Sequence, residues 1–435
     1  MEEDKILNFN LKRNNSTIIK VIGVGGGGGN AVNHMYKEGI HDVSFLLCNT
    51  DLQALERTDI PSKILLGVNE TAGLGAGNRP ERAKRAAEES IDEIRRALED
   101  GTRMVFVTAG MGGGTGTGAA PVIAKIAKDM GILTVGIVTI PFVFEGEPKI
   151  LQALYGVEEI RKNVDALLVI NNERLRELYS DVTITMRNAF KIADNTLTVA
   201  AKSIAEIITI NGIINLDFAD VNTVLKDGGV AVMNSGFGEG EERVKQAIEG
   251  ALHSPLLNNN EVFNAKKILF NIYFSEKDEL KMEEMNYVNE FMTKFGRGIE
   301  VIWGTAIDDS LEEKVKVTVL ATGFGLKSVS GISEHLTEEE LLRNSVDEEK
   351  ERKAAELIRS YYRETGTPTI GRIINAPKPI VLTADQFDDD MLISLLEEHP
   401  AYCRDAKVLQ QIKEAAGIKP KNQPPTATGN VINFR

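Results

Sequence analysis

The sequence predicts an α/β fold in which a parallel sheet, a central helix, a smaller α+β domain and a flexible C-terminal tail follow one another. From residue 18, short β-branched runs alternate with amphipathic helical patterns, as expected of parallel strands joined by crossover helices. Two glycine-rich segments each separate a predicted strand from a predicted helix. After residue 325 the composition becomes polar and charged, which predicts a flexible extension.

The first half contains the parallel strands. They are predicted at residues 18–23, 43–48, 63–66, 103–108, 133–139 and 166–170. Apolar residues at three- and four-residue spacing predict one amphipathic helix over 80–99. A longer helix over about 185–210 has apolar residues on more than one side, so we expect it to join two domains.

The second half has the same alternation with different spacing, which indicates the smaller α+β domain. Strands are predicted at 229–233, 267–273, 300–305 and 316–321, and helices at 241–252 and 281–295. The expected organisation is an N-terminal extension (1–17), the parallel-sheet domain (18–184), the central helix with its connection (185–214), the α+β domain (215–325), a polar linker (326–387) and a tail (388–435).

Composition and charge exclude several classes of function. The chain has 435 residues, is 42% hydrophobic and carries a formal net charge of −14, which repels nucleic acid and anionic lipid surfaces. Cys48 and Cys403 are too few and too far apart for a zinc site or a disulfide framework, so we expect a reducing cytoplasm. The longest apolar run, 131–144, is shorter than the ~20 residues of a membrane-spanning helix, so no membrane insertion is expected.

The first glycine-rich segment covers residues 23–30, directly after a strand and before a helix expected to begin near Ala31. Glycines allow backbone amides to approach phosphate oxygens, and a helix N-terminus adds its positive end. The segment also satisfies the G-x-G-x-x-G pattern, and Asp51 lies about 20 residues beyond it, as in dinucleotide-binding folds. An NAD-dependent oxidoreductase of the Rossmann type is therefore an alternative.

The second glycine-rich segment, 110–118, is a stronger signal. Each glycine costs about 0.5–1 kcal/mol of backbone entropy relative to alanine, so such density requires a reason. Backbone donors around a di- or triphosphate supply that reason, with the Thr115 and Thr117 hydroxyls as further hydrogen-bonding groups. The chain has no G-x-x-x-x-G-K-[ST] stretch, so it is not a Walker-type NTPase. We predict a nucleotide-binding domain whose second segment precedes a helix starting near Ala119.

The GGGTGTG stretch at 112–118 resembles the signature of the tubulin/FtsZ GTPase superfamily. Segments 21–30, 49–51, 73–77, 144–146 and 215–220 follow in the order and spacing of that family, so the resemblance covers residues 18–325. It implies a self-assembling cytoskeletal GTPase that binds GTP or GDP and forms head-to-tail filaments. Filaments of the FtsZ family build the division ring in bacterial cytokinesis, which implies a cytoplasmic protein at the mid-cell ring.

The resemblance also implies a nucleotide site. The residues around the phosphates would be Gly26, Gly27, Gly28, Gly29, Asn30, Gly113, Gly114, Thr115, Gly116, Thr117 and Gly118. Glu145 and Lys149 would reach the ribose and phosphate side, although the family usually has Arg at position 149. Asn172 would contact the base and Phe190 would stack on guanine.

Recognition of guanine is left open between two residues. The family commonly has Asp at the position of Asn195, so either the neighbouring Asp194 accepts from the guanine N–H groups or Asn195 suffices. These residues could also be plain polar positions on a helix near a domain junction. Because the glycine-rich segments hold few basic residues, Mg²⁺ is expected with the phosphates. No protein metal ligands are predicted.

Hydrolysis requires a positioned water, and the glycine-rich segments contain no carboxylate. Asn215, Asp217 and Asp220 match the N-x-D-x-x-D loop that, in the FtsZ family, one subunit inserts into the nucleotide site of the next. The resemblance thus implies hydrolysis at a subunit interface. The alternative is N-capping of a short helix over 220–226, for which Asp and Asn are well suited.

The tail contains one motif. Pro400, Ala401, Tyr402 and Arg404 resemble the peptide that docks FtsZ-family proteins on membrane-tethering division partners such as FtsA-like proteins. His399 and Cys403 depart from that peptide, and some thirty further residues follow it. A short helix that ends before a proline is the alternative.

Overall fold

The computed structural model describes residues 17–40, 42–178, 185–210, 212–252, 265–293 and 299–324, all within one compact unit. The predicted linker and tail, including the docking motif at 400–404, lie outside the described residues, as does nearly all of the N-terminal extension. We therefore describe the fold between residues 17 and 324.

The described strands form one ten-stranded sheet in the order β3-β2-β1-β4-β5-β6-β7-β10-β8-β9. Their bounds are β1 Ile19–Val24, β2 Val43–Asn49, β3 Lys63–Leu65, β4 Met104–Gly110, β5 Leu133–Ile140, β6 Ala166–Asn171, β7 Gly229–Gly238, β8 Lys267–Phe274, β9 Glu300–Ile307 and β10 Val315–Phe324. Neighbours from β3 to β7 are parallel, whereas β10 is antiparallel to both β7 and β8. This confirms the α/β class and every strand predicted from the sequence.

The two halves of the sheet meet at a narrow joint. Strand β6 pairs with β7 only through Ala166 with Gly229 and Leu167 with Val230. The amide of Gly229 adds one hydrogen bond, to the Asp165 carbonyl at 3.0 Å. The sequence did not predict this continuity, because strand pairing between segments so far apart leaves no local pattern.

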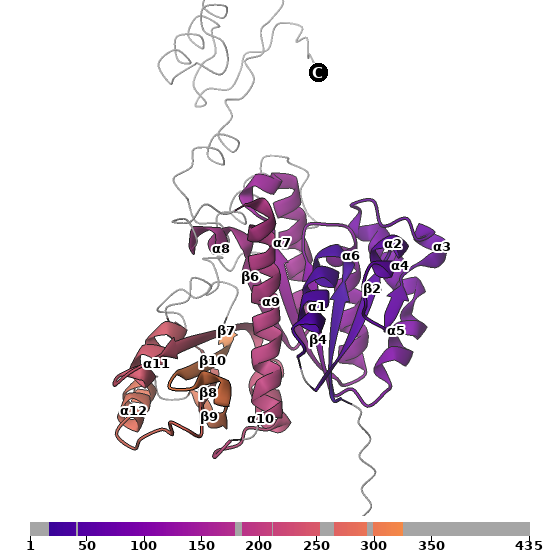
Figure 1. The fold of residues 1–435 in the computed structure, drawn as a ribbon. Coiled ribbons are helices and arrows are strands. Elements are labelled where there is room, and N and C mark those ends of the chain that lie inside the picture. The colour runs from indigo at the N-terminus through magenta and orange to yellow at the C-terminus, as the bar shows by residue number, and fades with distance from the viewer. Residues whose placement is uncertain are drawn as a thin grey trace, which may run out of the picture. The chain divides into compact units, whose positions relative to one another are not determined.

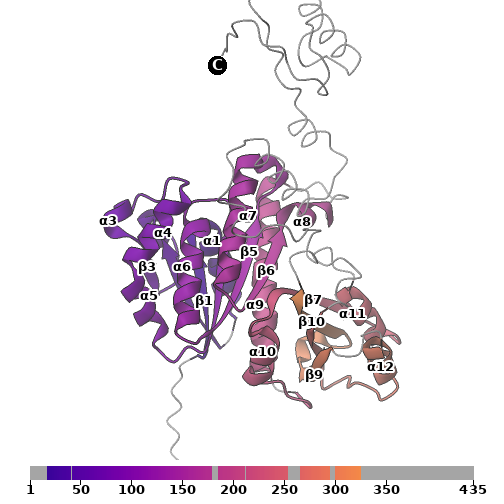
Figure 2. The same cartoon turned by 180° about the vertical axis from the view of Figure 1, so that it is seen from behind.

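Helices cover both faces of the parallel part, and α11 and α12 pack on the β7 to β10 part. They are α1 Gly25–Lys37, α2 Leu52–Glu56, α3 Val68–Thr71, α4 Pro80–Glu89, α5 Ile91–Leu98, α6 Thr115–Asp129, α7 Glu147–Lys162, α8 Asn172–Leu178, α9 Met186–Thr209, α10 Phe218–Leu225, α11 Arg243–Leu252 and α12 Met285–Thr293, with 3₁₀ turns η1 Val143–Glu145 and η3 Asp309–Leu311. Helices α1 and α9 cover the face seen in Figure 1, and α4 to α7 cover the face seen in Figure 2.

Helix α9 is the predicted central helix. In Figures 1 and 2 it runs between the parallel strands and the β7 to β10 region, with α8 near one end and α10 at the other. Its buried residues Leu197, Ala201 and Ile204 join the core of the parallel part. On its other side, Glu206 forms an ion pair with Lys316 of β10 at 2.9 Å. A second core lies between β7 to β10 and helices α11 and α12.

Two predicted helices have different bounds. The helix expected over 80–99 is broken at Ser90, whose backbone leaves helical geometry (φ −98°, ψ 17°) and whose hydroxyl accepts a hydrogen bond from the Gly67 amide at 3.0 Å. The helix expected from 281 begins at Met285, because the Glu284 carboxylate accepts from the Lys281 amide and bonds the buried Arg243. Both differences come from distant partners that periodicity does not reveal.

Candidate functional site

The two glycine-rich segments form the opening turns of helices. Helix α1 begins at Gly25 and α6 at Thr115, so the starts predicted near Ala31 and Ala119 are wrong. Close packing explains why glycine is used inside a helix. A Cβ on Gly28 would lie 2.2 Å from the Thr108 carbonyl oxygen, and one on Gly116 would lie 2.5 Å from that of Gly110.

The amino ends of α1 and α6 are neighbours. A Cβ on Gly25 would lie 2.8 Å from the Gly116 amide nitrogen. The residues before these helices, Val24 and Gly114, make no side-chain capping bond with the described first turns. Free amide donors and the positive ends of two helix dipoles therefore converge, which is the environment that a phosphate anion requires.

The glycines at this place divide into two groups. A Cβ on Gly26, Gly29 or Gly113 would meet nothing within 4 Å in the described part of the chain, so these residues border open space. Gly114 and Gly118 instead serve packing: a Cβ on Gly118 would lie 2.0 Å from the Pro80 oxygen, and one on Gly114 would lie 3.0 Å from the Arg79 nitrogen. The first group marks the room for a ligand.

The two predicted threonines have different partners. The Thr115 hydroxyl lies 2.7 Å from the Thr50 hydroxyl at the end of β2. The Thr117 hydroxyl accepts from the Gly112 amide at 2.9 Å and so braces the turn before α6. Gln152 of α7 braces the same turn by donating to the carbonyls of Gly112 and Gly113, at 3.0 and 3.1 Å.

The segment 72–79 packs onto the start of α6, where a Cβ on Gly114 would lie 3.0 Å from both the Ala76 Cβ and the Arg79 nitrogen. It contains several left-handed residues, including Ala72 (φ 51°) and Asn78 (φ 58°), a conformation that is strained for residues other than glycine. A polar network therefore has to hold this segment in place.

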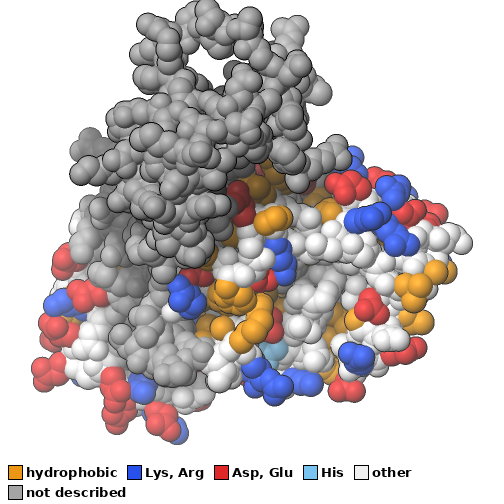
Figure 3. Space-filling view, turned by 90° about the horizontal axis from the view of Figure 1, so that it is seen from above, with side chains coloured by type: hydrophobic (Ala, Val, Ile, Leu, Met, Phe, Trp, Pro, Cys, Tyr) orange, Lys and Arg blue, Asp and Glu red, His pale blue; other side chains and the backbone are white. Residues whose placement is uncertain are grey.

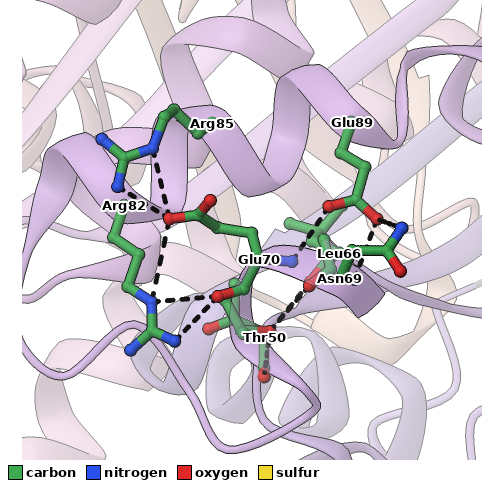
Figure 4. A network of polar contacts seen from close by, with 9 residues as sticks. Thr50, Leu66, Asn69, Glu70, Arg82, Arg85 and Glu89 are labelled. Carbon is green, nitrogen blue, oxygen red and sulfur yellow. Dashed lines mark hydrogen bonds and ion pairs between the residues drawn. The ribbon is translucent and has the colours of Figure 1, made fainter.

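Figure 4 shows that network, which joins α3 to α4. Arg85 forms an ion pair with Glu70 at 2.7 Å and holds the pKa of that carboxyl below its usual value. Arg82 donates to the Glu70 carbonyl at 2.7 Å, and Glu89 accepts from the amide of Asn69 at 3.0 Å. The network fixes α3 and, with it, the strained segment that follows.

The residues predicted for the base gather where β5 and β6 end. Asn172 opens α8, is 5% exposed, and its Oδ1 has no hydrogen-bond partner among the described residues. Phe190 is 36% exposed and meets Phe142 edge to face at 5.2 Å, while Phe142 stacks on Phe144 at 5.1 Å. A buried amide oxygen with no partner among the described residues and an accessible aromatic ring are each suited to contact a nucleobase.

Asp194 and Asn195 have different surroundings. Asp194 is half-buried, and this burial raises the pKa of its carboxyl to about 6 although His34 of α1 opposes the shift. Asn195 is exposed. Asp194 is thus close enough to His34 of α1 to interact with its charge, and its carboxyl changes protonation near pH 6.

Glu145 and Lys149 bind each other at 2.5 Å, across one turn at the start of α7. Glu145 also accepts from the Phe142 amide at 2.9 Å. A Cβ on Gly112 would lie 3.0 Å from the Lys149 side chain, so the pair lies at the edge of the turn before α6.

The remaining predicted residues, Asn215, Asp217 and Asp220, lie elsewhere. Asp217 and Asp220 form a reciprocal capping box at the start of α10, and Asn215 Oδ1 accepts from the Gly212 amide at 2.6 Å. The 24 residues of α9 span about 36 Å, and α10 lies at the opposite end of α9 from α8 (Figure 1). Within one chain these carboxylates and the amino ends of α1 and α6 do not meet.

Comparison with known proteins decides the family. Residues 18–180 match the model of the tubulin/FtsZ family GTPase domain, and residues 229–325 match that of the FtsZ family C-terminal domain. The chain is 54% identical over 418 residues to the cell division protein FtsZ of Porphyromonas gingivalis, which covers 94% of this chain and 90% of that protein. This chain belongs to the FtsZ family.

Other members and structures agree with this FtsZ assignment. The chain is 45% identical to cell division protein FtsZ of Aquifex aeolicus over 70% of this chain and 83% of that protein. It is 41% identical to a solved FtsZ dimer from M. jannaschii, with a TM-score of 0.64 and coverage of 71% of this chain and 88% of that one. CetZ2 of Haloferax volcanii, solved as a GTPγS-bound protofilament, shares the fold at 19% identity, a TM-score of 0.60 and coverage of 77% and 98%.

The FtsZ-family match makes the domain a GTPase. It gives no support to the NAD-dependent oxidoreductase that the first glycine-rich segment left open, since that segment lies inside the GTPase match. Among the described residues, no three His, Cys, Asp or Glu side chains cluster as metal ligands. No helix in this described part is long and apolar enough to cross a bilayer.

Three residues that interact with the predicted site residues were not predicted from the sequence: Thr50, Gln152 and His34. Gln152 lies three residues after Lys149, a spacing that brings both to one face of α7, and this pattern could have identified it. His34 carries no local signal, and Thr50 lies in the segment 49–51 that carries the family resemblance, but nothing in that segment indicates its hydrogen bond to Thr115. Figure 3 shows that the middle of the face seen from above is mostly uncharged, with charged side chains toward the rim.

Proposed function

We propose that this chain binds GTP at the amino ends of α1 and α6 and hydrolyses it when a second copy supplies Asp217 and Asp220. The observation that carries the proposal is the separation of these two sets of groups by the length of α9. From Asp194 to Thr209 alone, the helix rises by about 22 Å, so the carboxylates cannot reach a nucleotide bound by their own chain.

The nucleotide would lie with its phosphates in the open space beside Gly26, Gly29 and Gly113. Its base would lie between Phe190 and Asn172, whose unpaired Oδ1 can accept an N–H hydrogen bond. Asp194 is the better candidate for reading guanine, because a carboxylate accepts from both the N1–H and the exocyclic amine, whereas the amide of Asn195 offers one acceptor.

We expect Mg²⁺ with the phosphates. Lys149 is the basic side chain among the predicted site residues, and its charge is already paired with Glu145. A divalent ion bound with the phosphates would neutralise the charge that remains and the charge that develops during hydrolysis.

Asp217 and Asp220 keep the chemical capacity for this role. Asp217 uses Oδ1 in the capping box and Asp220 uses Oδ2, which leaves one oxygen of each carboxylate without a hydrogen bond among the described residues. Those oxygens can hold and polarise a water that attacks the γ-phosphate. Asn215 would support the turn that presents them, since it bonds the Gly212 amide.

Exposed hydrophobic side chains at both places support a head-to-tail contact. Leu74, in the segment over α6, is 86% exposed, and Ile213, two residues before Asn215, is 70% exposed. Burial of these side chains in a contact between subunits would remove apolar surface from water. A contact of unlike surfaces that does not close forms a filament.

The names of the relatives point to the cell process. We infer that these filaments serve bacterial cell division, which the name cell division protein FtsZ indicates for the relatives. The cytoplasm and the division ring, as their place in the cell, are part of this inference. Docking of a membrane-tethering partner, such as an FtsA-like protein, through Pro400, Ala401, Tyr402 and Arg404 is part of this proposal and rests on the sequence motif alone.

Light scattering and phosphate release, recorded together after GTP or ATP is added with Mg²⁺, test the proposal. We expect scattering and hydrolysis with GTP but not with ATP, and a rate per subunit that rises steeply above a threshold concentration. A rate per subunit that stays constant on dilution below the scattering threshold would contradict a site shared between copies.

A further inference from the structure

A buried hydroxyl, that of Thr50, and a partly exposed one, that of Thr115, lie where strand β2 meets helix α6. Thr50 directly follows β2 and is 0% exposed, and its Oγ1 lies 2.7 Å from Oγ1 of Thr115, the first residue of α6. The Cβ of Thr115 lies 3.1 Å from the position that a Cβ on Gly25 would occupy. Thr115 therefore lies where the amino end of α6 meets that of α1.

The direction of the hydrogen bond follows from burial. The Thr50 amide donates to Asn49 Oδ1 at 2.9 Å, and the Thr50 carbonyl accepts from the Gly75 amide at 2.9 Å. For its hydroxyl proton, Thr115 is the one acceptor within reach among the described residues. A buried donor without an acceptor keeps its full desolvation penalty, so Thr50 donates and Thr115 accepts.

We propose that Thr50 is a positioning residue, which turns the Thr115 hydroxyl into a fixed donor to a phosphate oxygen of the bound nucleotide. With its oxygen occupied by the Thr50 proton, Thr115 directs its own proton to the side where the two helix ends converge. A donor fixed in advance loses less entropy on binding than a freely rotating hydroxyl. This inference rests on the proposed nucleotide site at α1 and α6.

The surroundings hold Thr50 in place. The Thr71 hydroxyl donates to the Gly67 carbonyl at 2.9 Å and approaches the Thr50 carbonyl at 3.4 Å. Thr71 ends α3, which the Glu70 ion pairs with Arg82 and Arg85 tie to α4, and Figure 4 shows Thr50 next to this network. Thr50 is thereby held in place by α3 and, through α3, by α4, in addition to the strand β2 that precedes it.

A double-mutant cycle on GDP affinity, measured by isothermal titration calorimetry, tests the inference. Thr115→Val should weaken GDP binding about tenfold or more, because one hydrogen bond to a charged oxygen is lost. Thr50→Val should weaken it about threefold to tenfold, and Thr50→Ser should restore it because Ser keeps the hydroxyl. Adding Thr50→Val to Thr115→Val should cause no further loss, because without the Thr115 hydroxyl the Thr50 proton has no group to orient.

The chain offers a matched control. Thr318 is also 0% exposed and its hydroxyl pairs with that of Ser235 at 2.8 Å, between β10 and β7. Thr318→Val removes the same kind of hydroxyl pair and should leave GDP affinity unchanged. Thermal unfolding of all variants shows whether each is folded, and Thr50→Ala, which introduces no new methyl contact, replaces Thr50→Val if that variant unfolds.

The titrations are repeated in EDTA with GDP. We expect the loss in Thr50→Val to persist, because the donated proton goes to a phosphate and not to a metal ligand. A loss that appears only with Mg²⁺, additive losses in the double variant, or wild-type affinity in Thr50→Val would each overturn the inference. Gly26→Asp distinguishes a failure of the Thr50 inference from a failure of the proposed nucleotide site. If this variant leaves GDP binding intact, the proposed nucleotide site itself is wrong.

Discussion

Asp220 Oδ2 accepts a hydrogen bond from the Asp217 amide at 2.9 Å, and Asp217 Oδ1 accepts from the Asp220 amide at 3.2 Å. The two residues thus form a reciprocal capping box at the start of α10. N-capping is the role that the sequence left open as the alternative to catalysis. Since each capping bond uses one oxygen, the two roles are compatible. A substitution that removes the whole carboxylate abolishes capping and catalysis together, so it cannot distinguish the two roles.

Asp220→Asn should separate them. The amide oxygen can still accept from the Asp217 amide, so folding should be unchanged, while the lost charge should lower GTP hydrolysis about 100-fold or more. Asp220→Ala should lose hydrolysis too and also cost about 1 kcal/mol of stability. Phosphate release and thermal unfolding check this. Near-normal hydrolysis by Asp220→Asn would leave Asp220 with capping alone.

Gly26→Asp should abolish GTP and GDP binding without unfolding the chain. Its side chain would enter open space, and an acid near the N-terminus of a helix is favourable for the helix but repels phosphate. Gly26→Asn is the matched uncharged control and should bind at least tenfold more tightly than Gly26→Asp. Titration of a fluorescent GDP analogue measures both. Equal affinities would show that the phosphates lie elsewhere.

Gly28→Ala should behave differently from either Gly26 variant. Its Cβ would lie 2.2 Å from the Thr108 oxygen, so α1 must move away from β4 and stability should fall by about 1–3 kcal/mol. Urea unfolding measures the change. Wild-type stability would contradict the division of these glycines into packing and ligand-facing groups.

Asp194 should make GDP binding depend on pH. Burial raises the pKa of its carboxyl to about 6, so below pH 6 it is protonated and no longer accepts from both guanine N–H groups. Affinity should fall about tenfold between pH 7 and pH 5 in the wild type, and this slope should vanish in Asp194→Asn. Calorimetry over this range checks it. If Asn195→Ala removes the preference for guanine and Asp194→Asn does not, Asn195 reads the base.

The same group should affect the stability of the nucleotide-free protein. A carboxyl whose pKa is raised on folding contributes stability that is fully present below pH 3.8 and is lost as pH rises through about 6. Asp194→Asn should therefore stabilise the chain at pH 7.5 by about 1–2 kcal/mol, after discounting for partial exposure, but not at pH 4. Denaturant unfolding at both pH values measures this, and an equal effect at both would exclude a charge origin.

Ile213→Asp should prevent assembly while leaving the subunit intact. The side chain is 70% exposed, so the change should cost little stability, but a charge there would be buried in the proposed contact. The concentration threshold for scattering should rise about tenfold or more with unchanged GDP affinity. Tyr155→Asp on α7, at a side chain 56% exposed, is the control. The same rise in both variants would point to a general charge effect.

The sequence predicted the strands well because each has a strong local pattern. Strands such as β4 and β5 are continuous apolar runs between turn residues, and their bounds moved by one or two positions. The starts of α1 and α6 were wrong because glycine is a poor helix former in isolation. Its cost is offset there by packing against β4, which no local pattern records.

The nucleotide residues were predicted from a motif, but the motif does not tell which of them serve packing and which border open space. Thr50 and Thr115 are separated by 65 positions, and their hydrogen bond depends on the pairing of β1 with both β2 and β4. Likewise, the GGGTGTG stretch does not tell that Gly118 packs on Pro80 while Gly113 borders open space. Contacts of this kind follow from topology, so they require the folded structure.

GTP hydrolysis by a mixture of Asp220→Asn and Gly26→Asp subunits tests most directly whether the site is shared between copies. The first variant keeps the amino ends of α1 and α6, and the second keeps the carboxylates, so some mixed contacts contain one complete site. We predict that each variant alone is inactive and that phosphate release returns in part when they are mixed. No recovery in a mixture whose co-assembly has been demonstrated by sedimentation would contradict the account and favour a site within one chain.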